Sequence, residues 1–335
     1  MRTKISIKEI SEKADVSIAT VSRVINKNGR YSKETEERVL RVIRENDYQP
    51  NLIAKGLRER KMTNVGILVP DIKNEFFTKL IYEIERNLFA GGYETFVCNT
   101  DEDETIEKKH VQMMAMQNVC GLIYISGSAQ SSSESREGIP TVYIDRIPSE
   151  PHKNDCMITS DNVQGGFLAT EELLKQGVKR PLFVTSRKFV SVYAERFEGY
   201  CKALAAFGFS ESDRHVVALD SLHYQAAYEK LKELLKSGTF DYDGIFAGSD
   251  WLAIGCYQAL KEHGYSIPEQ VKLVGYDDIS ITAFNAIPIT TIHQQVDEMG
   301  RLAAQHLIRA MEGGRHEEQL LRVPVYTVPR ASTRG

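Results

Sequence analysis

The feature that most constrains this chain is the stretch from Ala14 to Asn26, which predicts a short helix after a tight turn. Ser17 can cap the start of this helix, and Val21, Val24 and Ile25 recur on one side at helical spacing. Other side chains fall on different faces and can point outward: Ile18, Ala19, Ser22, Arg23 and Asn26. The stretch therefore predicts a helix with an apolar inner side and a contact-making outer side.

A first helix precedes this stretch, because Ser6 can cap it and Ile7 and Ile10 face inward. Two short helices joined by a tight turn predict a helix-turn-helix, whose second helix enters the major groove of DNA. An ordinary helical hairpin in a bundle is the alternative. It is disfavoured because a core-facing hairpin would not leave Arg23 and small residues on its outer face.

The residues from Ile7 to Asn26 closely resemble the N-terminus of the lactose/galactose repressor (LacI/GalR) family in the spaced pattern Ile7-Lys8-Glu9-Ile10-Ser11, Ala14, Val16-Ser17 and Thr20-Val21-Ser22-Arg23-Val24-Ile25-Asn26. One departure is Asp15, where the family usually has Gly; Asp tolerates a left-handed backbone, so the turn should survive. The resemblance implies base contacts by Ile18, Ala19 and Arg23. It implies further DNA contacts, mainly to phosphate or neighbouring base edges, by Ser17, Thr20, Ser22 and Asn26. Arg23 can instead bind phosphate alone, which would not read sequence.

A third helix should begin after Ser32 and reach about Asn46, with an inward stripe of Val39, Leu40, Val42 and Ile43. Pro50 then ends regular structure, and Asn51 can cap a helix of roughly eight residues that is too short to be stable alone. This segment resembles the family's hinge helix, which implies minor-groove contacts by Asn51, Ala54 and Leu57, with Leu57 as the wedge that kinks DNA. An ordinary interdomain linker is the alternative.

Composition limits the remaining possibilities. Residues 1–61 hold 15 Lys and Arg against 9 Asp and Glu, whereas the rest of the chain holds 27 against 37, so a basic head precedes an acidic body. The five cysteines lack metal-ligand spacing and fit a reducing cytoplasm, and no signal peptide or membrane-spanning run is present. No phosphate-binding, dinucleotide-binding or nucleophile-elbow motif occurs, which predicts no cofactor, no metal and no enzyme.

From residue 64 onward, short apolar runs alternate with amphipathic stretches. Strands are predicted near 65–69, 94–98, 121–125, 141–144, 181–185, 244–247 and 273–276, and helices near 75–90, 104–116, 161–176, 191–206, 222–236, 249–263 and 295–312. This alternation predicts parallel sheets covered on both faces. The body resembles periplasmic sugar-binding proteins, which implies two doubly wound lobes joined by three crossing segments near 159–162, 288–294 and 318–325.

The expected organisation is therefore an all-helical head and an α/β body. We predict a helix-turn-helix domain at 1–49, a hinge at 50–61 and an effector-binding body at 62–330. The first lobe would comprise about 62–160 and 293–318, and the second about 161–289 and 322–330.

Ligands of such folds bind at the carboxyl ends of the strands. Asn74, Phe76 and Phe77 follow the first strand and offer an amide and flat apolar faces to a sugar, although a helix cap and core packing would explain them too. Asp145 and Arg146 follow the fourth strand and could grip vicinal hydroxyls, with an interlobe ion pair as the alternative.

Five further residues are assigned by the resemblance or by position. Arg196 and Asp277 match effector-binding residues of the family, and Ser249 stands where a ligand-binding Asn is common. Trp251 could stack on the ligand or serve packing, and Gln294 could reach the ligand from a crossing segment. Asp278 is expected to cap the next turn.

These features together predict a cytoplasmic, homodimeric transcription repressor of sugar-utilisation genes. Its partners would be a palindromic DNA operator, a ribose-like monosaccharide effector and, as in some relatives, a phosphorylated carrier protein. A sugar-binding receptor or a sugar-modifying enzyme that shares the body fold is the alternative. Effector identity, inducer or corepressor action, and operator sequence stay open at this point.

Overall fold

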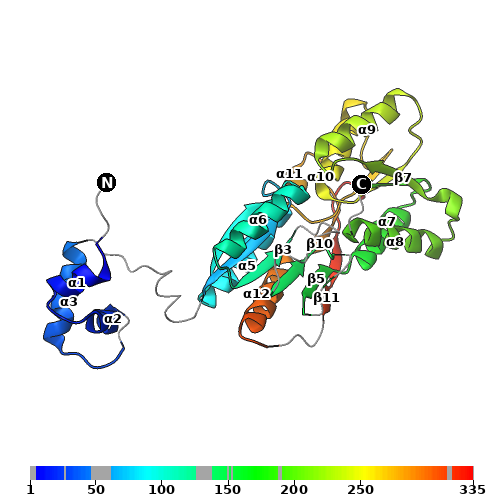
Figure 1. Ribbon diagram of the computed structural model, residues 1–335. Helices are drawn as coiled ribbons and strands as arrows, with labels where there is room; N and C mark the ends of the chain where they lie inside the picture. Colours follow the sequence, from blue (N-terminus) through cyan, green and yellow to red (C-terminus); the bar gives the residue numbers. More distant parts are fainter. Residues whose placement is uncertain are drawn as a thin grey trace. The chain divides into compact units, whose positions relative to one another are not determined.

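The computed structural model of the chain describes residues 5–25, 28–46, 62–125, 138–148, 151, 154–187, 191–314 and 319–334. The chain forms two compact units, Met1–Met62 and Thr63–Gly335, which are described separately (Figure 1). The predicted DNA contacts Asn26, Asn51, Ala54 and Leu57 lie outside the described residues, as does the predicted hinge at 50–61. Among the described helices, none combines the length and the apolar character needed to cross a membrane.

The first unit contains three helices: α1 (Ile7–Lys13), α2 (Ile18–Ile25) and α3 (Lys33–Glu45). Ser6 and Glu9 form a capping box at the start of α1, and Ser17 accepts a hydrogen bond from the backbone N–H of Thr20 at 3.1 Å. Asp15 adopts a φ of +50°, so the left-handed turn expected between α1 and α2 is present without glycine.

The core of this unit is formed by inward side chains of all three helices, including Ile10, Val21, Val24 and Val39. Leu40 was expected in this core and is instead 38 % exposed. Leu40 follows Val39 by one residue, about 100° further round the helix, and that rotation turns it towards solvent. The remaining predicted stripe of α3 packs inward as expected.

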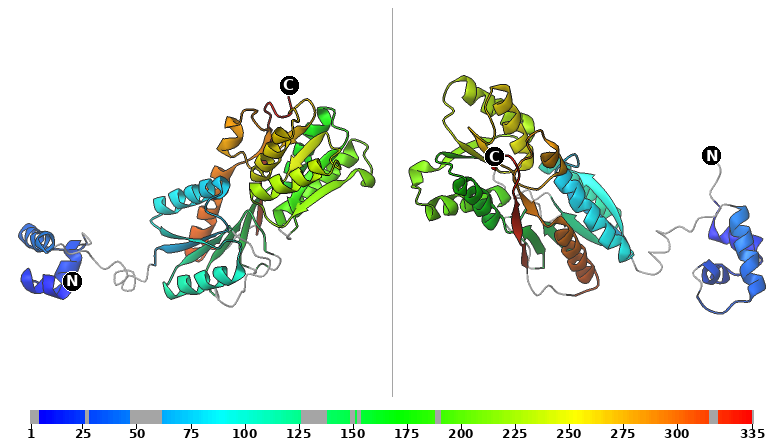
Figure 2. Two further views of the ribbon diagram at one scale, coloured as in Figure 1. Left: turned by 90° about the horizontal axis from the view of Figure 1, so that it is seen from above. Right: turned by 180° about the vertical axis from the view of Figure 1, so that it is seen from behind.

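The second unit contains two α/β lobes. The first lobe has a six-stranded parallel sheet in the order β11-β5-β4-β3-β1-β2. Its strands are β1 (Asn64–Val69), β2 (Glu94–Asn99), β3 (Gly121–Tyr124), β4 (Thr141–Ile144), β5 (Cys156–Ser160) and β11 (Leu320–Val323). Helices α5 (Glu75–Ala90) and α12 (Val296–Met311) cover one face, and α6 (Glu104–Met116) covers the other (Figure 2).

The second lobe has a four-stranded parallel sheet in the order β7-β6-β8-β9. Its strands are β6 (Pro181–Ser186), β7 (His215–Leu219), β8 (Gly244–Ala247) and β9 (Lys272–Val274). Helices α7 (Asn162–Lys175) and α8 (Ser191–Ala206) pack on one face, and α9 (Tyr224–Lys236) and α10 (Asp250–Glu262) on the other. A 3-10 turn (Glu211–Asp213) and the short helix α11 (Ser280–Phe284) complete this lobe.

The chain passes between the lobes at three places: between β5 and α7, along β10 (Thr291–Gln294), and between β11 and β12 (Val325–Val328). Strands β10 and β12 pair antiparallel. The predicted start of the second lobe's last piece, at 322, falls inside β11, which pairs with β5 of the first lobe. The pairing moves that boundary to Pro324.

Candidate functional site

The outer side of α2 presents the residues that were assigned to DNA. Ser17, Ile18, Ala19 and Arg23 are exposed, whereas Thr20 and Ser22 are half-buried. Ile18, Ala19, Ser22 and Arg23 line a shallow hollow with Asn28 and Gly29. A Cβ atom at Gly29, whose φ is +83°, would lie 3.2 Å from Cδ of Arg23, so a larger residue there would crowd the arginine stem. Helix α2 therefore offers one cation flanked by small and apolar groups.

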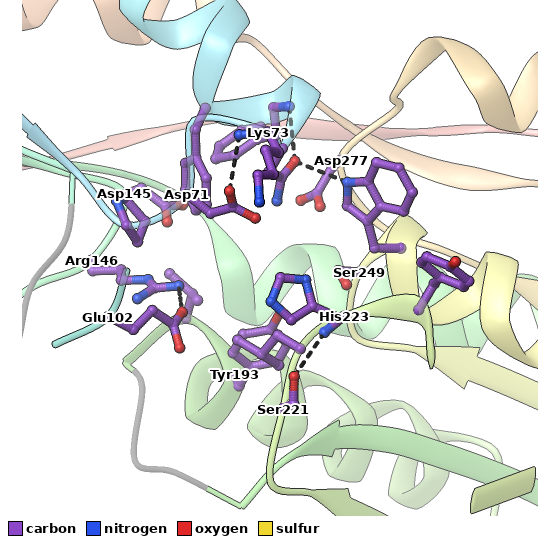
Figure 3. Close-up of a pocket in the computed structure, with 18 of the residues that line it drawn as sticks. Asp71, Lys73, Glu102, Asp145, Arg146, Tyr193, Ser221, His223, Ser249 and Asp277 are labelled. Atoms are coloured by element: carbon purple, nitrogen blue, oxygen red, sulfur yellow. Dashed lines mark hydrogen bonds and ion pairs between the residues drawn. The ribbon is translucent and has the colours of Figure 1, made fainter. Parts of the chain in front are cut away.

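A cavity of about 650 Å³ opens in the second unit where the carboxyl ends of strands from both lobes meet (Figure 3). Nine of the ten predicted effector contacts line it: Asn74, Phe76, Phe77, Asp145, Arg146, Arg196, Ser249, Trp251 and Asp277. Gln294 does not line the cavity. It is fully buried and its Nε2 donates to Oδ1 of Asp277 at 2.7 Å. Gln294 thus orients a cavity carboxyl from behind.

Arg196 is held on every side by the second lobe. Its Nε donates to Oδ1 of Asn162 at 2.9 Å, and its Nη1 donates to the carbonyl oxygen of Gly248 at 2.6 Å. The guanidinium carbon lies 3.6 Å from the centre of the Tyr276 ring, and Nη2 lies 3.8 Å from Oδ1 of Asp277. Because two of its three nitrogens are already bonded, Arg196 keeps one orientation and directs Nη2 towards the cavity carboxyl.

Asp145 and Arg146 occupy the first-lobe side of the cavity. Nη2 of Arg146 donates to Oε1 of Glu102 at 2.9 Å, so this ion pair lies within one lobe and is not the interlobe pair considered from sequence. Asp145 and Glu102 have φ values of +69° and +57°. Left-handed backbones at non-glycine residues are costly and concentrate at functional sites.

Two polar atoms on this side lack a hydrogen-bond partner among the described residues: Oδ1 of Asp145 and Nε of Arg146. Both side chains are buried, at 3 % and 7 % exposure. A buried acceptor and a buried donor without partners are expensive in a folded protein. The residues that carry both atoms line the cavity.

Burial governs the ionisation of the cavity carboxyls. Desolvation raises the pKa of Asp277 to about 7, against the attraction of Arg196. Burial also raises the pKa of Asp145, and it raises the pKa of the neighbouring Asp250 well above its ordinary value, with further repulsion from Asp277. The cavity therefore contains one carboxyl, that of Asp277, which can exchange a proton near neutral pH.

Asn74, Phe76 and Phe77 were interpreted from sequence either as cavity residues or as a helix cap with core packing, and the structure contains both arrangements. Asn74 caps α5 through the N–H of Phe76 at 3.0 Å, and both phenylalanines belong to the first-lobe core. All three also line the cavity. Nε1 of Trp251 donates to Oδ1 of Asn74 at 3.2 Å, which links α10 of the second lobe to α5 of the first.

Comparisons with known proteins agree with this geometry. Residues 62–331 match the family described as periplasmic binding proteins and sugar binding domain of LacI family, and residues 6–51 match bacterial regulatory proteins, lacI family. The chain belongs to the lacI family. The ribose operon repressor of Halalkalibacterium halodurans is 32 % identical over 98 % of this chain and 97 % of its own length.

Two solved structures illustrate the likeness. A lacI-family regulator from Enterococcus faecium with bound ribose has 28 % identity and a TM-score of 0.71, and covers 80 % of this chain and 98 % of its own. The lac repressor dimer bound to operator and an anti-inducer shares the fold, with 21 % identity and a TM-score of 0.85 over 99 % of both chains. These findings confirm the predicted fold class. They also confirm the prediction of a sugar-responsive, DNA-binding transcription repressor, since the family is one of transcription regulators and not of enzymes.

The lacI-family cavity also contains residues that the sequence had not marked. They are Pro70, Asp71, Lys73, Asp101, Glu102, Val192, Tyr193, and the run Asp220, Ser221, Leu222, His223, Tyr224 and Gln225. The last six follow β7, which was not predicted because its alternation is weak and it forms a sheet edge. A strand prediction at 215–219 would have marked 220–225 as a strand end and hence as a candidate site.

Asp278 was expected to cap a turn, and this expectation is wrong. Its carboxylate accepts from Nδ1 of His293 at 2.8 Å and from Nη2 of Arg330, and the residue before α11 is Ile279. These bonds attach the strand end that carries Asp277 to crossing strand β10 and to the C-terminal segment. Asp278 thus stabilises the crossing.

Further hydrogen bonds join the two lobes of this regulator around the cavity. Oε2 of Glu75, at the start of α5, accepts from Oγ of Ser280 at 2.7 Å, and Oε1 of Glu195 accepts from Nη2 of Arg322 at 2.9 Å. Together with the Trp251–Asn74 bond, they hold the lobes in one arrangement. The backbone N–H of Ile147 also donates to Oγ of Ser191 at 3.0 Å. A ligand that spans both lobes can shift the balance between lobe arrangements that make these bonds and arrangements that do not.

Proposed function

We propose that the effector of this repressor is a small neutral sugar of the ribose type, bound between Asp145, Arg146, Arg196 and Asp277. The observation that carries the proposal is the pair of unpartnered buried atoms, Oδ1 of Asp145 and Nε of Arg146, beside a fixed guanidinium. Each sugar hydroxyl both donates and accepts, so adjacent hydroxyls can satisfy a carboxylate and a guanidinium at once. The relatives named for ribose support the same class.

Binding can act on DNA through the lobes. A sugar that contacts Arg146 in one lobe and Arg196 in the other stabilises the lobe arrangement that contains both contacts. If the operator-bound state requires a different arrangement, the sugar lowers operator affinity by linkage. We propose an inducer on this basis, acting on a repressor that works in the cytoplasm.

The experiment that tests this function combines sequence selection and effector titration with the full-length protein. Rounds of selection from random duplex DNA should enrich a palindrome, and D-ribose should weaken binding to that palindrome by about tenfold or more, which corresponds to a coupling of about 1–3 kcal/mol. Enrichment of no palindrome would refute the operator. If a palindrome is enriched but its affinity does not change when D-ribose is added, the proposed effector is refuted and the proposal of a palindromic operator stands.

Replacing Arg23 with alanine should reduce sequence preference. A guanidinium bidentate to guanine contributes about 1–3 kcal/mol of discrimination, so Arg23→Ala should weaken palindrome binding by roughly fivefold to a hundredfold and leave random DNA nearly unaffected. Arg44→Ala, which removes an exposed cation from α3, serves as the matched control. Fluorescence anisotropy on both DNAs measures the effect. Equal losses on both DNAs in Arg23→Ala would assign this residue to phosphate alone.

We also propose that the repressor is a homodimer, as a palindrome with two half-sites requires. Large apolar side chains are exposed on neighbouring parts of the body: Phe284 at 84 % and Ile281 at 42 % on α11, and Tyr82 at 60 % and Phe89 at 70 % on α5. The Glu75–Ser280 bonds place α11 against the start of α5. Large apolar side chains exposed in this number support a protein–protein contact, and a second copy is the occupant that symmetry demands.

Phe89→Glu should weaken that dimer. A charge introduced into an apolar contact is expected to cost about 2 kcal/mol or more, so the dimer dissociation constant should rise by about thirtyfold or more. Sedimentation velocity over a concentration series reports the change. Phe207→Glu introduces the same charge at another exposed aromatic and should leave the dimer unchanged. A dimer that tolerates Phe89→Glu would place the interface elsewhere.

The predicted phosphorylated carrier protein stays a prediction, since nothing in the described part of the chain supports it.

A further inference from the structure

A chain of buried hydrogen bonds connects Arg196 in the second lobe with Asp145 in the first. Nε of Arg196 donates to Oδ1 of Asn162 at 2.9 Å, and Nδ2 of Asn162 donates to Oγ1 of Thr159 at 3.2 Å. Oγ1 of Thr159 donates in turn to the carbonyl oxygen of Asp145 at 2.9 Å. Thr159 and Asn162 are fully buried, and they lie on either side of the first crossing, near the end of β5 and at the start of α7. The chain thus passes between the lobes and ends at a cavity residue on each side.

The donors and acceptors of this chain can point in only one direction. The Nε–H of an arginine can only donate, so Asn162 presents its amide oxygen to Arg196 and its NH2 group to Thr159. A carbonyl oxygen can only accept, so the single hydroxyl hydrogen of Thr159 is committed to Asp145. Nδ2 of Asn162 also donates to the carbonyl oxygen of Ser160 at 3.1 Å. Position 159 therefore needs a group that accepts and donates at once, which a hydroxyl does and a hydrocarbon does not.

The bond from Thr159 falls on a residue with a costly backbone. Asp145 has a φ of +69°, and its own N–H donates to the carbonyl oxygen of Ile158 at 2.8 Å. Strand β5 therefore holds both backbone groups of Asp145, the N–H through Ile158 and the carbonyl through Thr159. A left-handed backbone at a non-glycine residue persists only where the surroundings fix it. The direction in which the carboxyl of Asp145 enters the cavity thus depends on the Thr159 hydroxyl.

At the other end of the chain, Arg196 is fixed to the first turn of α7. A Cβ atom at Gly166 would lie 2.1 Å from the carbonyl oxygen of Arg196, so the backbones of α7 and α8 are in contact at this level. Asn162 precedes Gly166 by four residues, about one helical turn, and bonds the guanidinium directly. Close packing leaves α8 little freedom to move over α7. The guanidinium of Arg196 therefore follows the side chain of Asn162.

We propose that Thr159 and Asn162 are positioning residues of the effector site, which set Asp145 and Arg196 relative to each other across the first crossing. This inference deepens the proposed function and rests on it, because Asp145 and Arg196 are two of the four residues assigned to the sugar. A purely local role, in which Thr159 only satisfies the carbonyl of Asp145, is the alternative. The two roles differ in reach, since only a positioning role extends from Thr159 to the guanidinium of Arg196.

Thr159→Val tests the proposal without a ligand. Valine keeps the branched shape and removes the hydroxyl, so the amide of Asn162 loses one of its two acceptors and holds Arg196 less firmly. Nuclear magnetic resonance of the 15N-labelled full-length protein follows the Nε–H of Arg196, which is assigned by its absence in Arg196→Lys. Its exchange with water should become about fivefold faster or more, as expected when one hydrogen bond is lost. Thr159→Ser restores the hydroxyl and should stay within about twofold of the original protein.

Thr170→Val is the matched control. Thr170 is also fully buried on α7, and its hydroxyl donates to the carbonyl oxygen of Gly166 at 2.8 Å. Both valine variants lose a buried hydroxyl and some thermal stability, but Thr170→Val should leave the Arg196 hydrogen within about twofold of its original exchange rate. Unchanged exchange in Thr159→Val would refute the positioning role. Equal acceleration in Thr170→Val would also refute it, because general loosening of α7 would then explain the effect.

Calorimetry with D-ribose measures the consequence for the effector. Thr159→Val should weaken D-ribose by about fivefold to tenfold, whereas Thr159→Ser and Thr170→Val should change its affinity by less than about twofold. If D-ribose binds the original protein and Thr159→Val equally well, the positioning role is refuted and the proposed function stands. If D-ribose binds neither, the proposed effector is refuted, and the exchange rate of the Arg196 hydrogen decides the positioning role by itself.

Discussion

Arg196→Lys is expected to leave operator binding intact and to abolish most of the response to sugar. Lysine keeps the positive charge near Asp277, but it cannot reproduce the planar fork that bonds Asn162 and Gly248 while directing Nη2 into the cavity. Loss of one or two charge-assisted hydrogen bonds to the ligand, at about 1.5–3 kcal/mol each, predicts a fall in sugar affinity of about a hundredfold.

Calorimetry with D-ribose and fluorescence anisotropy with the selected palindrome measure the two sides of this prediction. Arg214→Lys is the control, since Arg214 forms a surface ion pair with Glu211. Lysine is preferred to an uncharged residue because removing the cation would leave Asp277 buried and uncompensated, a change that by itself destabilises a protein by about 3–5 kcal/mol. Unchanged sugar affinity in Arg196→Lys would remove this residue from the effector site.

Sugar affinity is also expected to rise by about tenfold between pH 6 and pH 8. Burial raises the pKa of Asp277 to about 7, so about a tenth of these carboxyls are ionised at pH 6 and about nine tenths at pH 8. A neutral sugar donates hydroxyl hydrogens best to the ionised form, and binding should therefore be tightest above the pKa. The charged or titratable groups around Asp277 are Arg196 and Tyr193 on α8, Asp145 after β4, Asp250 on α10 and Tyr276 after β9.

The effect of pH on folding stability through Asp277 has the opposite sign to its effect on sugar affinity. A carboxyl whose pKa is higher in the folded than in the unfolded state binds more protons when folded, so Asp277 contributes relative stability at low pH that is lost as pH rises from about 4 to about 7. Thermal unfolding at each pH separates this effect from ligand affinity. Asp277→Asn should weaken the sugar by about tenfold at pH 8 and flatten the pH dependence. A steep pH dependence that persists in Asp277→Asn would assign it to another carboxyl.

Local sequence patterns predicted the framework of this protein well. The helices α5 to α10 and α12 begin and end close to the predicted ranges, and side-chain caps mark the starts of α5, α6, α7 and α10. The turn between α1 and α2 formed around Asp15 as expected. Strands β5, β7, β10, β11 and β12 were not predicted, since each is four or five residues long and owes its state to pairing with distant strands.

The residues of the candidate site divide in the same way, into those that a local pattern marks and those that depend on distant contacts. Asp145, Arg196 and Asp277 were found because they follow a predicted strand or match a family position. Glu102 was missed because its role depends on a left-handed backbone and on Arg146, which lies 44 residues away. Gln294 was placed at the cavity by its position on a crossing segment, but its rotation about β10 turns it onto Asp277. Long-range contacts and side-chain direction are the properties that a local pattern does not contain.

The edge strand β11 has a consequence for synthesis of the protein. It is formed by Leu320–Val323 and completes the sheet whose first strand is Asn64–Val69, so the first lobe is completed by a segment that is translated long after its first strand. During synthesis, one flank of that sheet therefore stays unpaired until Leu320–Val323 has left the ribosome. Contacts of such sequence separation slow folding. Chaperone dependence and intolerance of deletion of Leu320–Val323 should follow, whereas the three helices of the head, which pack on one another over short sequence separations, are free to fold as soon as they emerge.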